Sequence, residues 1–530
     1  MMMRSLKLFN SFMRKDRNAL NSFQSLITNR CYCVAAINPL TWEHAKPLKN
    51  IPTVGTYEFI VGNLPWGKFY KKDFADIVRL LHEEKGDIFL WKGIFGQNDL
   101  VFTQTPDDFE NIFRHDGIWP ERKFLELATY HRNVYRKDYF GDVTGLLASE
   151  GKAWGDLRTL INPILVHPKN TKIYLPSLSK INQEFIDKVR KIRNPETLEV
   201  PADFADEIKR WTLESVGMVA LDKELGLING HNPEAMAFVD STQLFFDLTV
   251  ELEFKPSLWR YLPNKKFNEA MQILDNVIVF ATKYINEAIE RFEKSPTDKP
   301  EIEKSVLEKL LKIDKKVAII TAVEMFTAGV DTTSTALMGL LLCLAKNPEK
   351  QEKLRQEILS VLPEKNSELT VENMKNLPYL RACIKESLRV YPLAVANVRQ
   401  TAEDLVLSGF QIPKGSNVNM TSINLIKDSK YFSQPNEFIP ERWLRNENKD
   451  DTCPHNSATK SNNPFIYLPF GFGPRSCIGR RIAEMELEIA IARLVRNFGI
   501  EFNYPTENAF KCLQLYLPVI PMKFKFTDLN

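Results

Sequence analysis

The 530-residue sequence has few cysteines and no paired arrangement of them. Its seven cysteines are an odd number, and no two of them form a Cys-x-x-Cys pair. This usage argues against a disulfide scaffold or a zinc site, and it fits a reducing compartment. The formal net charge of +3 at pH 7 is also too small to indicate a nucleic-acid-binding protein.

The start of the chain lacks the run of about 20 apolar residues that a membrane-spanning helix requires. Residues 1–36 instead carry six basic residues, four serines and a single acid, Asp16. Their apolar residues fall near helical spacing beside basic positions, which is typical of a mitochondrial presequence. A disordered basic tail is the alternative. We therefore predict a presequence over 1–36, with a cleavage site near Arg30.

The remaining sequence lacks repeats and a dividing linker. Helical periodicity predicts helices over residues 146–166, 177–193, 201–221, 267–293, 303–312, 316–345, 346–361, 378–390 and 478–498. Short strands are predicted over residues 88–91, 99–103, 405–410 and 417–421. The polar stretch 446–463 is typical of a surface loop. These patterns predict one large, mainly α domain over 37–530.

A glycine-rich loop just before the last predicted helix contains the spacing Phe-x-x-Gly-x-Arg-x-Cys-x-Gly, from Phe470 to Gly479. Cys477 in this loop projects from the amino-terminal end of a helix, where backbone N–H groups and the helix dipole favour a thiolate. A thiolate with an open apolar face suits a haem iron as an axial ligand. An isolated cysteine, in contrast, is more often a small buried hydrophobe.

This loop resembles the haem-binding loop of the cytochrome P450 family. The resemblance implies haem b (iron protoporphyrin IX) as cofactor, with Cys477 as the proximal iron ligand. It further implies that Arg475 pairs with a haem propionate and that Phe470 packs against the sulfur. The implied fold is mainly α, the cytochrome P450 fold, a triangular helical bundle with small peripheral β-sheets, and it covers essentially all of residues 40–530.

A second pattern interrupts an apolar helix with the sequence Ala-Gly-Val-Asp-Thr-Thr at residues 328–333. A glycine inside a helix costs about 1 kcal/mol relative to alanine, so a close approach is expected at Gly329. Ala328 and Thr332 share one face and leave a notch for a diatomic ligand. A Thr-rich kink in a core helix would explain the motif alone. Its resemblance to the oxygen-activation motif of the family assigns Asp331 and Thr332 to proton delivery.

A set of three charged residues also matches the family. Glu386 and Arg389 lie at i, i+3 in an apolar helix, and Arg442 follows in a later Pro-Glu-Arg-Trp run. The resemblance implies that these three form a buried, structural charge network behind the thiolate loop.

Trp154 and Arg158 place two hydrogen-bond donors at i, i+4, able to reach one anionic group. A core tryptophan beside a surface arginine is the ordinary interpretation of that pair. The resemblance implies instead that both residues contact a haem propionate, and that Arg399 holds the other propionate.

The sequence lacks a Gly-x-Gly-x-x-Gly nucleotide fingerprint and a ferredoxin-type cysteine cluster. Electrons are therefore expected from a separate protein. Four basic residues near the thiolate loop are candidates for a positive docking patch, with a solvated surface as the alternative: Arg381, Lys385, Arg480 and Arg481. Resemblance to mitochondrial cytochrome P450 proteins implies that they dock an acidic, adrenodoxin-like ferredoxin, which an NADPH-dependent ferredoxin reductase reduces.

Residues 341–348, 378–387 and 503–508 resemble the insect mitochondrial cytochrome P450 family 12, a detoxification group. The resemblance implies a haem-thiolate monooxygenase on the matrix side of the inner membrane, in peripheral contact with it. Its substrates would be O₂ and apolar small molecules, namely xenobiotics such as insecticides. An ecdysteroid or steroid-hormone hydroxylase, an electron-independent haem-thiolate isomerase and a non-catalytic haem-binding protein are the alternatives. Apolar residues 244–246 and 258–262 are expected at the substrate entrance, at the membrane or in the core.

Overall fold

A computed structural model of the chain describes residues 41–123, 125–230, 232–294, 300–444, 463–512 and 515–529. The predicted presequence, and all but the last residue of the surface loop predicted over 446–463, lie outside these residues. The chain forms two units, Met1–Ala45 and Lys46–Asn530. Within the described residues, the first unit contains only the short 3₁₀ helix η1 (Trp42–His44). All elements below belong to the second unit.

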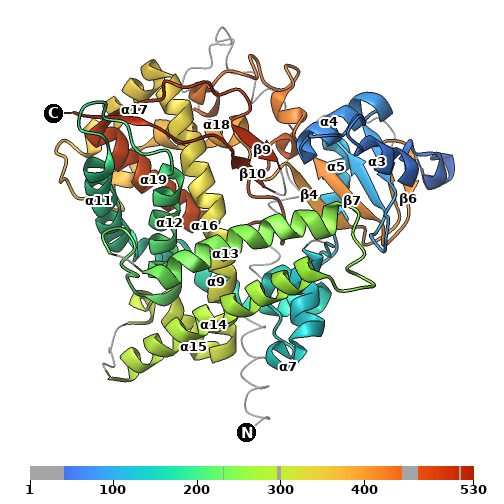
Figure 1. Cartoon of the computed structure of the whole chain (residues 1–530), viewed down its shortest axis with the longest axis horizontal. Helices are drawn as coiled ribbons and strands as arrows, with labels where there is room; N and C mark the ends of the chain where they lie inside the picture. The colour runs from blue at the N-terminus through green and yellow to red at the C-terminus, as the bar shows by residue number, and fades with distance from the viewer. Residues whose placement is uncertain are drawn as a thin grey trace, which may run out of the picture. The chain divides into compact units, whose positions relative to one another are not determined.

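A single long helix, α16 (Lys315–Lys346), forms the centre of the second unit (Figure 1). The Asp314 side chain caps its start by accepting from the backbone N–H groups of Lys316 and Val317. The helices with the most extensive packing on it are α12 (Phe204–Leu221), α14 (Lys265–Lys294), α15 (Val306–Ile313), α18 (Pro378–Val390) and α19 (Arg480–Asn497). Because helices surround α16, it is apolar on nearly every side.

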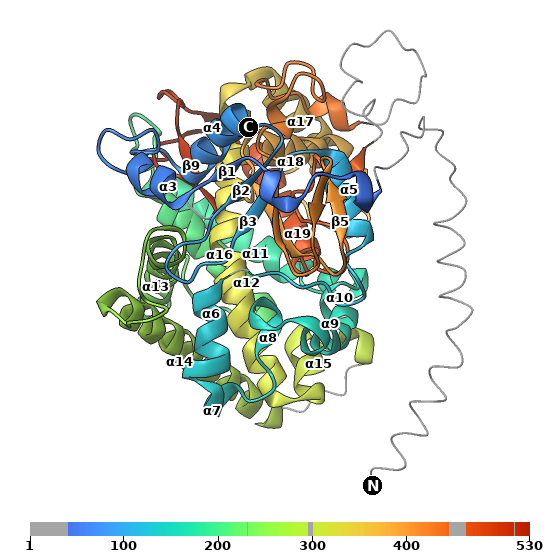
Figure 2. The same ribbon diagram turned by 90° about the vertical axis from the view of Figure 1, so that its right-hand side faces the viewer.

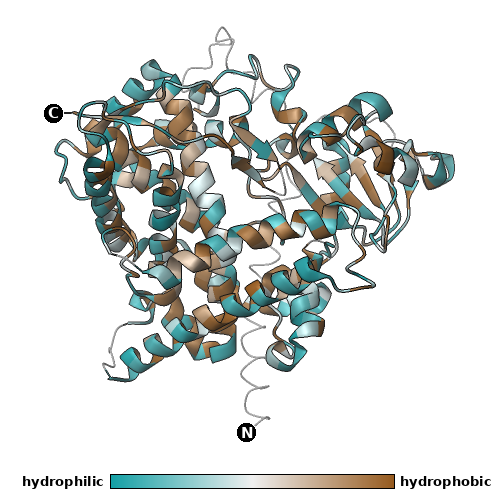
Figure 3. Ribbon diagram, in the orientation of Figure 1, coloured by the Kyte–Doolittle hydropathy of each residue, from teal (hydrophilic) through white to brown (hydrophobic). Residues whose placement is uncertain are grey.

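The other helices surround this centre, and several of them show one apolar and one polar face (Figure 3). They are α3 (Thr56–Gly62), α4 (Phe74–Lys85), α5 (Pro106–Arg114), α6 (Glu126–Tyr130), α7 (Lys137–Phe140), α8 (Gly145–Ala148), α9 (Gly151–Leu165), α10 (Pro168–Lys172), α11 (Leu175–Ile192), α13 (Pro233–Thr249) and α17 (Pro348–Val361). Two π-helical turns extend α6 and α13, namely η3 (His131–Tyr135) and η4 (Val250–Phe254).

Every predicted helix is present, and most ends differ from the prediction by only a few residues. The segment 146–166 was predicted as one helix and is two, because extended backbone at Ser149 and Glu150 separates α8 from α9. The prediction missed α4 and α5, although both have one apolar face, and it also missed α13. That helix packs on both α14 and α16, so its apolar residues are spread around its circumference and give weak periodicity.

The largest sheet has the strand order β1-β2-β3-β7-β4. Its strands are β1 (Thr53–Val54), β2 (Ile88–Trp91), β3 (Leu100–Thr103), β7 (Asn417–Thr421) and β4 (Ala396–Gln400). Figure 2 shows β1, β2 and β3 side by side. The pairs β2–β3 and β4–β7 are antiparallel, whereas β1–β2 and β3–β7 are parallel. The bounds predicted for β2 and β7 are confirmed.

Three two-stranded sheets complete the strands of the described residues. They are β5 (Leu405–Leu407) with β6 (Phe410–Ile412), β8 (Phe498–Glu501) with β11 (Lys525–Asp528), and β9 (Phe510–Cys512) with β10 (Tyr516–Pro518). The single strand predicted over 405–410 is wrong. Ser408 and Gly409 both adopt positive φ angles, 46° and 81°, and turn the chain into a hairpin there.

Within the described ranges, α16 is the one helix long and apolar enough to span a membrane. Of its most apolar 18-residue window, 83% is buried inside the protein. Its composition is therefore that of a core helix.

Candidate active site

One face of α16 is open, although the rest of that helix is buried. Between Val317 and Ala345, the residues that are not buried are Met325, Ala328, Gly329 and Thr332. They follow the spacing i, i+3, i+4, i+7 and therefore share one face. The Thr332 hydroxyl donates to the Ala328 carbonyl at 2.7 Å. The motif thus places small residues and one hydroxyl along the open face of the helix.

The glycine of this motif is explained by the neighbouring helix. A Cβ atom on Gly329 would lie 3.1 Å from a methyl group of Val216 in α12. The close approach expected from the sequence is therefore an approach between two helices. It allows α12 and α16 to pack closely at the edge of the open face.

Asp331 is buried beside this face, with 3% of its surface exposed. Neither of its carboxylate oxygens has a hydrogen-bond partner among the described residues. Burial raises the pKa of this carboxyl, and the positive charge of Lys209 in α12 opposes the shift only in part. A buried acid of this kind is suited to holding a proton next to Thr332.

Cys477 lies in the tight loop that the sequence predicted. Its backbone N–H donates to the Phe470 carbonyl at 2.9 Å, and Gly471 and Gly473 both adopt φ angles of 71°. These left-handed angles favour glycine and close the loop under the thiol. Backbone N–H groups of Gly479 and Arg480 point to the sulfur.

The expected preference of Cys477 for the thiolate is not found. Burial raises the pKa of the thiol, and this effect outweighs the two backbone N–H groups and the charges of Arg158 and Arg480. The helix α19 begins at Arg480, three residues after the thiol, so its dipole acts from farther away than predicted. The thiolate therefore requires a positive partner such as a metal ion.

The Cys477 side chain is exposed, unlike the buried free cysteines Cys343, Cys383 and Cys512. Yet burial by the surrounding protein is the main influence on its pKa. Both observations hold for a side chain that faces an internal space. An open thiol in a protein interior provides the donor that a haem iron needs.

Arg475, two residues before the thiol, contacts an aromatic ring, a carboxylate and backbone carbonyls. Its guanidinium lies 3.9 Å from the ring centre of Trp154. It donates to Glu150 at 3.0 Å and to the Pro120 carbonyl at 2.8 Å. Burial lowers its pKa to about 9. The structure therefore brings together Trp154 and Arg475, which come from distant segments.

Arg399 and Arg158 border the same region. Arg399 donates to Asp116 at 2.6 Å and to the Phe472 carbonyl at 3.1 Å. Arg158 donates to the Ser476 carbonyl at 2.9 Å, and burial lowers its pKa to about 10. Both arginines are thus tied to the loop that carries the thiol.

Sequence reasoning missed a fourth arginine, Arg122. Burial is the main cause of its lowered pKa, repulsion from Arg399 adds to the shift, and the charges of Glu150, Glu324 and Cys477 oppose it. Arg122 lies in an irregular segment, where no periodicity or motif marks it.

These four arginines and two acids define a cluster that suits an anionic group. The arginines are Arg122, Arg158, Arg399 and Arg475, and the acids are Asp116 and Glu150. The cluster has two more positive than negative charges, and Asp116 Oδ1 and Arg158 Nε have no hydrogen-bond partner among the described residues. A haem carries two propionates, so the residues present fit it.

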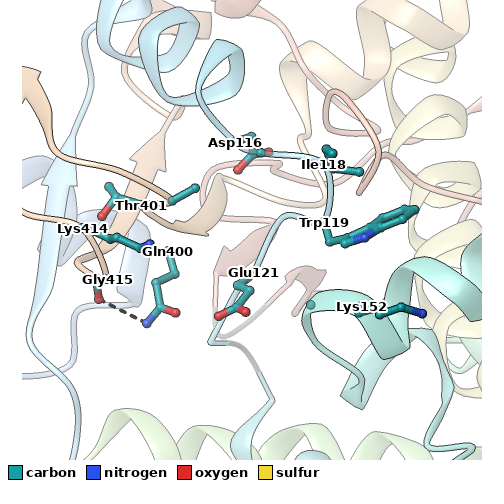
Figure 4. A pocket seen from close by; sticks show the side chains of 12 residues that line it. Asp116, Ile118, Trp119, Glu121, Lys152, Gln400, Thr401, Lys414 and Gly415 are labelled. Carbon is teal, nitrogen blue, oxygen red and sulfur yellow. Dashed lines mark hydrogen bonds between the residues drawn. The ribbon is translucent and has the colours of Figure 1, made fainter.

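A cavity of about 480 Å³ borders this cluster (Figure 4). Its lining includes the buried Asp116 and the exposed Ile118, so it extends from the cluster toward the surface. The Gln400 side chain crosses its edge and donates to the Gly415 carbonyl at 3.2 Å.

Glu386, Arg389 and Arg442 are brought together with no exposed side-chain surface. Glu386 lies 2.8 Å from an Arg389 guanidinium nitrogen and 3.0 Å from one of Arg442. The Trp443 indole N–H also donates to Glu386 at 2.8 Å. All the hydrogen-bonding capacity of this carboxylate is directed to structural partners.

The four predicted docking residues differ in their surroundings. Arg381 pairs with Glu488 and Arg480 with Glu484, each at 2.9 Å. Lys385 and Arg481 are exposed. The Arg480 guanidinium lies 5.2 Å from the centre of the Phe470 ring.

An open thiol in a glycine-turned loop, an arginine cluster tied to that loop and a core helix with one open face are the features of a haem-thiolate protein. The family model for cytochrome P450 matches residues 52–526, and the chain belongs to that family. The mainly α fold predicted from the sequence is confirmed. The cofactor of this family is haem b, and the chain is a cytochrome P450 monooxygenase.

Curated relatives are similar over most of their length. The chain is 52% identical to "Cytochrome P450 CYP12A2" of Musca domestica, over 92% of each chain. It is 49% identical to "Probable cytochrome P450 12a5, mitochondrial" of Drosophila melanogaster, over 93% of each chain. It is 45% identical to "Probable cytochrome P450 12c1, mitochondrial" of the same fly, over 92% of this chain and 93% of the relative. The predicted similarity to the insect family 12 is confirmed.

Proposed function

We propose that this chain is a mitochondrial monooxygenase that oxidises apolar small molecules, xenobiotics such as insecticides, with electrons from a ferredoxin. The observation that carries the proposal is the open face of α16, where small and apolar residues lie next to a hydroxyl in an otherwise buried core helix. Relatives named as mitochondrial support the compartment. The presequence proposed for residues 1–36 agrees with it.

Haem b, when bound, supplies the iron at which O₂ is activated and the substrate is oxidised. In our proposal Cys477 provides the proximal ligand and Phe470 supports the ligand loop. The propionates would be held by Trp154, Arg158, Arg399 and Arg475, and by Arg122, which the sequence did not suggest. Buried guanidiniums are already desolvated, so they interact strongly with a carboxylate.

Asp331 and Thr332 are proposed to move protons at the open face of α16. The Thr332 hydroxyl is positioned by its bond to the Ala328 carbonyl. Asp331, which burial makes easier to protonate, is the nearest acid along the helix and acts as the reservoir.

We expect Thr332→Ala to separate electron use from product formation. Without the hydroxyl, proton supply at the open face fails, and product formed per NADPH should fall about tenfold while NADPH is still consumed and hydrogen peroxide accumulates. The matched control is Thr327→Ala, because Thr327 donates to the carbonyl four residues back at 2.8 Å but is buried on another face. Equal product yields from the two variants would contradict the assignment.

Electrons are proposed to enter through the basic patch around the thiolate loop. Because Arg381 and Arg480 are partly neutralised by Glu488 and Glu484, the exposed Lys385 and Arg481 carry most of its free charge. The acidic partner would be an adrenodoxin-like ferredoxin, supplied by an NADPH-dependent reductase. Electrostatic docking of this kind raises the association rate and weakens with salt.

Charge reversal tests this patch. Lys385→Glu combined with Arg481→Glu should raise the KM for ferredoxin about tenfold at low salt, since two favourable charges become repulsive. The difference from the unmodified protein should shrink as ionic strength rises. Lys294→Glu at the end of α14 is the control, because Lys294 is exposed and belongs to another surface. An unchanged KM in the double variant would exclude this docking site.

Contact with the matrix side of the inner membrane is also proposed. The connection between α13 and α14 exposes Leu258, Tyr261 and Leu262 by 50%, 66% and 67%. Near α3, Tyr57 and Trp66 are exposed by 80% and 78%. Large apolar side chains exposed to this degree favour a lipid surface.

Reconstitution tests the function. The purified holoprotein should convert insecticides to hydroxylated or otherwise oxidised products when O₂, NADPH, ferredoxin and reductase are all present, and not when ferredoxin is omitted. Conversion of ecdysteroid precursors alone would assign the hormone pathway instead. Turnover without electrons would indicate an isomerase, and binding without turnover would indicate a non-catalytic haem protein.

A further inference from the structure

Glu150 is an acid of the arginine cluster, at the start of α9. It occupies the N-cap position of that helix, but its side chain makes no capping hydrogen bond to it. Instead, Glu150 Oε2 accepts from the Arg475 guanidinium at 3.0 Å and from the backbone N–H of Arg122, also at 3.0 Å. One carboxylate oxygen therefore joins the loop that carries Cys477 to the segment before α6.

Charged groups from several elements surround this carboxylate. Arg475 in the loop before α19, and Arg122 and Lys123 in the segment before α6, attract it. Glu121 borders the same helix start on the side of the cavity. The groups whose charges act on the surrounding arginines are Asp116, Arg158, Glu324, Arg399 and Cys477. Among the residues that the structure describes, Glu150 is the one acid that forms an ion pair with Arg475.

The surroundings of Glu150 allow it to gain and lose a proton. Burial raises the pKa of this carboxyl, and the Arg122 N–H and the nearby positive charges oppose the shift only in part. The side chain nevertheless keeps 24% exposure. Gly151, the next residue, lines the cavity shown in Figure 4. Water can therefore deliver a proton to the carboxylate.

A haem bound at this cluster strengthens the effect. In our proposal Arg475 binds a propionate, and Arg475 is the guanidinium that Glu150 already contacts. Like charges brought into one site raise the pKa of a carboxyl. One further negative charge, added when the haem is reduced, raises the proton affinity of Glu150 again. Electron gain by the haem and proton gain by Glu150 therefore favour each other.

We propose that Glu150 takes up a proton when the haem accepts an electron and releases it when the haem is oxidised again. The step forms one O–H bond on the carboxylate, with the proton taken from water and the electron supplied by the ferredoxin. The total charge of the site then stays constant during reduction. The inference rests on the proposed function for the site of the propionates and for the source of the electron.

The sign of the pH dependence follows from linkage. The reduced state binds the proton more tightly, so rising pH shifts the equilibrium toward the ferric form. The range lies above that of an ordinary carboxyl, because burial raises the pKa of Glu150. A single charge acting through protein with an effective dielectric constant of about 20 predicts a change of about fivefold in the ferrous-to-ferric ratio.

A spectroelectrochemical titration of the holoprotein measures this change. The ferrous-to-ferric ratio is read in the Soret band at a fixed electrode potential, and the electrode takes the place of the ferredoxin. In the unmodified protein the ratio should fall about fivefold between pH 5.5 and pH 8. Reduction in weakly buffered solution should also remove protons, which a pH-indicator dye records.

Three variants separate the charge of Glu150 from its contacts. Glu150→Gln keeps an oxygen acceptor for Arg475 and for the Arg122 N–H but carries no charge, so its ratio should stay at the low-pH value throughout. Glu150→Asp keeps the charge and should keep most of the pH dependence. Glu121→Gln is the matched control, because Glu121 lines the same cavity but forms no ion pair with an arginine of the cluster among the described residues. It should behave like the unmodified protein.

The outcomes are distinct. A ratio independent of pH in the unmodified protein, or an unchanged pH dependence and proton uptake in Glu150→Gln, would place the proton elsewhere and overturn the proposal. Loss of both in Glu150→Gln, with normal haem content and an intact thiolate Soret band, is the result expected for a charge effect. Because the titration needs neither ferredoxin nor substrate, a protein that shows this behaviour but oxidises no apolar compound would refute the proposed function alone.

Discussion

Cys477→Ala is expected to remove the red-shifted Soret band that thiolate ligation gives the reduced, carbon monoxide-bound protein. Cys477 presents an open thiol to the internal space, whereas the other described free cysteines are buried. Without this ligand, turnover should fall to background, because no other described cysteine faces that space. The measurements are the optical difference spectrum, the haem content and NADPH-dependent product formation.

A second cysteine in the core provides the control. Cys343 lies in α16, is buried and has a pKa raised by burial, so it behaves as a small apolar residue. Cys343→Ala should keep the red-shifted band and lose only about 1 kcal/mol of stability through the small cavity it leaves. Retention of the thiolate band in Cys477→Ala would refute the assignment of the iron ligand.

Glu386→Gln is expected to destabilise the protein by about 3–5 kcal/mol, because it leaves two buried guanidiniums without a counter-charge. Arg389 and Arg442 both pair with this carboxylate and, like it, have no exposed side-chain surface. Burial already lowers the pKa of Arg442, which indicates how costly its charge is without the partner. Chemical unfolding of the holoprotein, with haem retention as a second signal, measures the loss.

An exposed pair with the same helical spacing serves as the comparison. Glu372 and Lys375 lie at i, i+3, like Glu386 and Arg389, but their side chains are 79% and 57% exposed. Glu372→Gln should leave the unfolding midpoint unchanged, because water already solvates both charges. If the two substitutions had equal effects, burial would not be the source of the Glu386 contribution.

The sequence predicted the elements whose physical signals are local. Helical periodicity marked α18 because its buried positions follow a regular spacing along one face. The loop before Cys477 was marked because its glycines adopt left-handed φ angles that other residues avoid. The helix α13 escaped prediction because it is covered by α14 and α16 on different sides, which removes the periodicity.

Properties that depend on the charges around a residue were predicted less well. The position of Cys477 near a helix start suggested a lowered pKa, but burial raises it, and burial is a property of the whole fold. Arg122 belongs to the cluster through its position near Arg399, Glu150 and Cys477, and no local sequence pattern marks such a residue in an irregular segment. The sequence placed Arg381 and Arg480 in a positive docking patch. In the structure, Glu488 and Glu484 partly neutralise these two charges.

By itself, the sequence determined the family and the cofactor, because both are indicated by motifs with fixed spacings of a few residues. Only the tertiary structure decided which side chains face the internal space, since exposure and desolvation depend on elements that are distant along the chain. The open face of α16 is the example: its motif is local, but the space beside it is made by the folded chain. The contact of Glu150 with Arg475, 325 residues away, is likewise a product of folding alone.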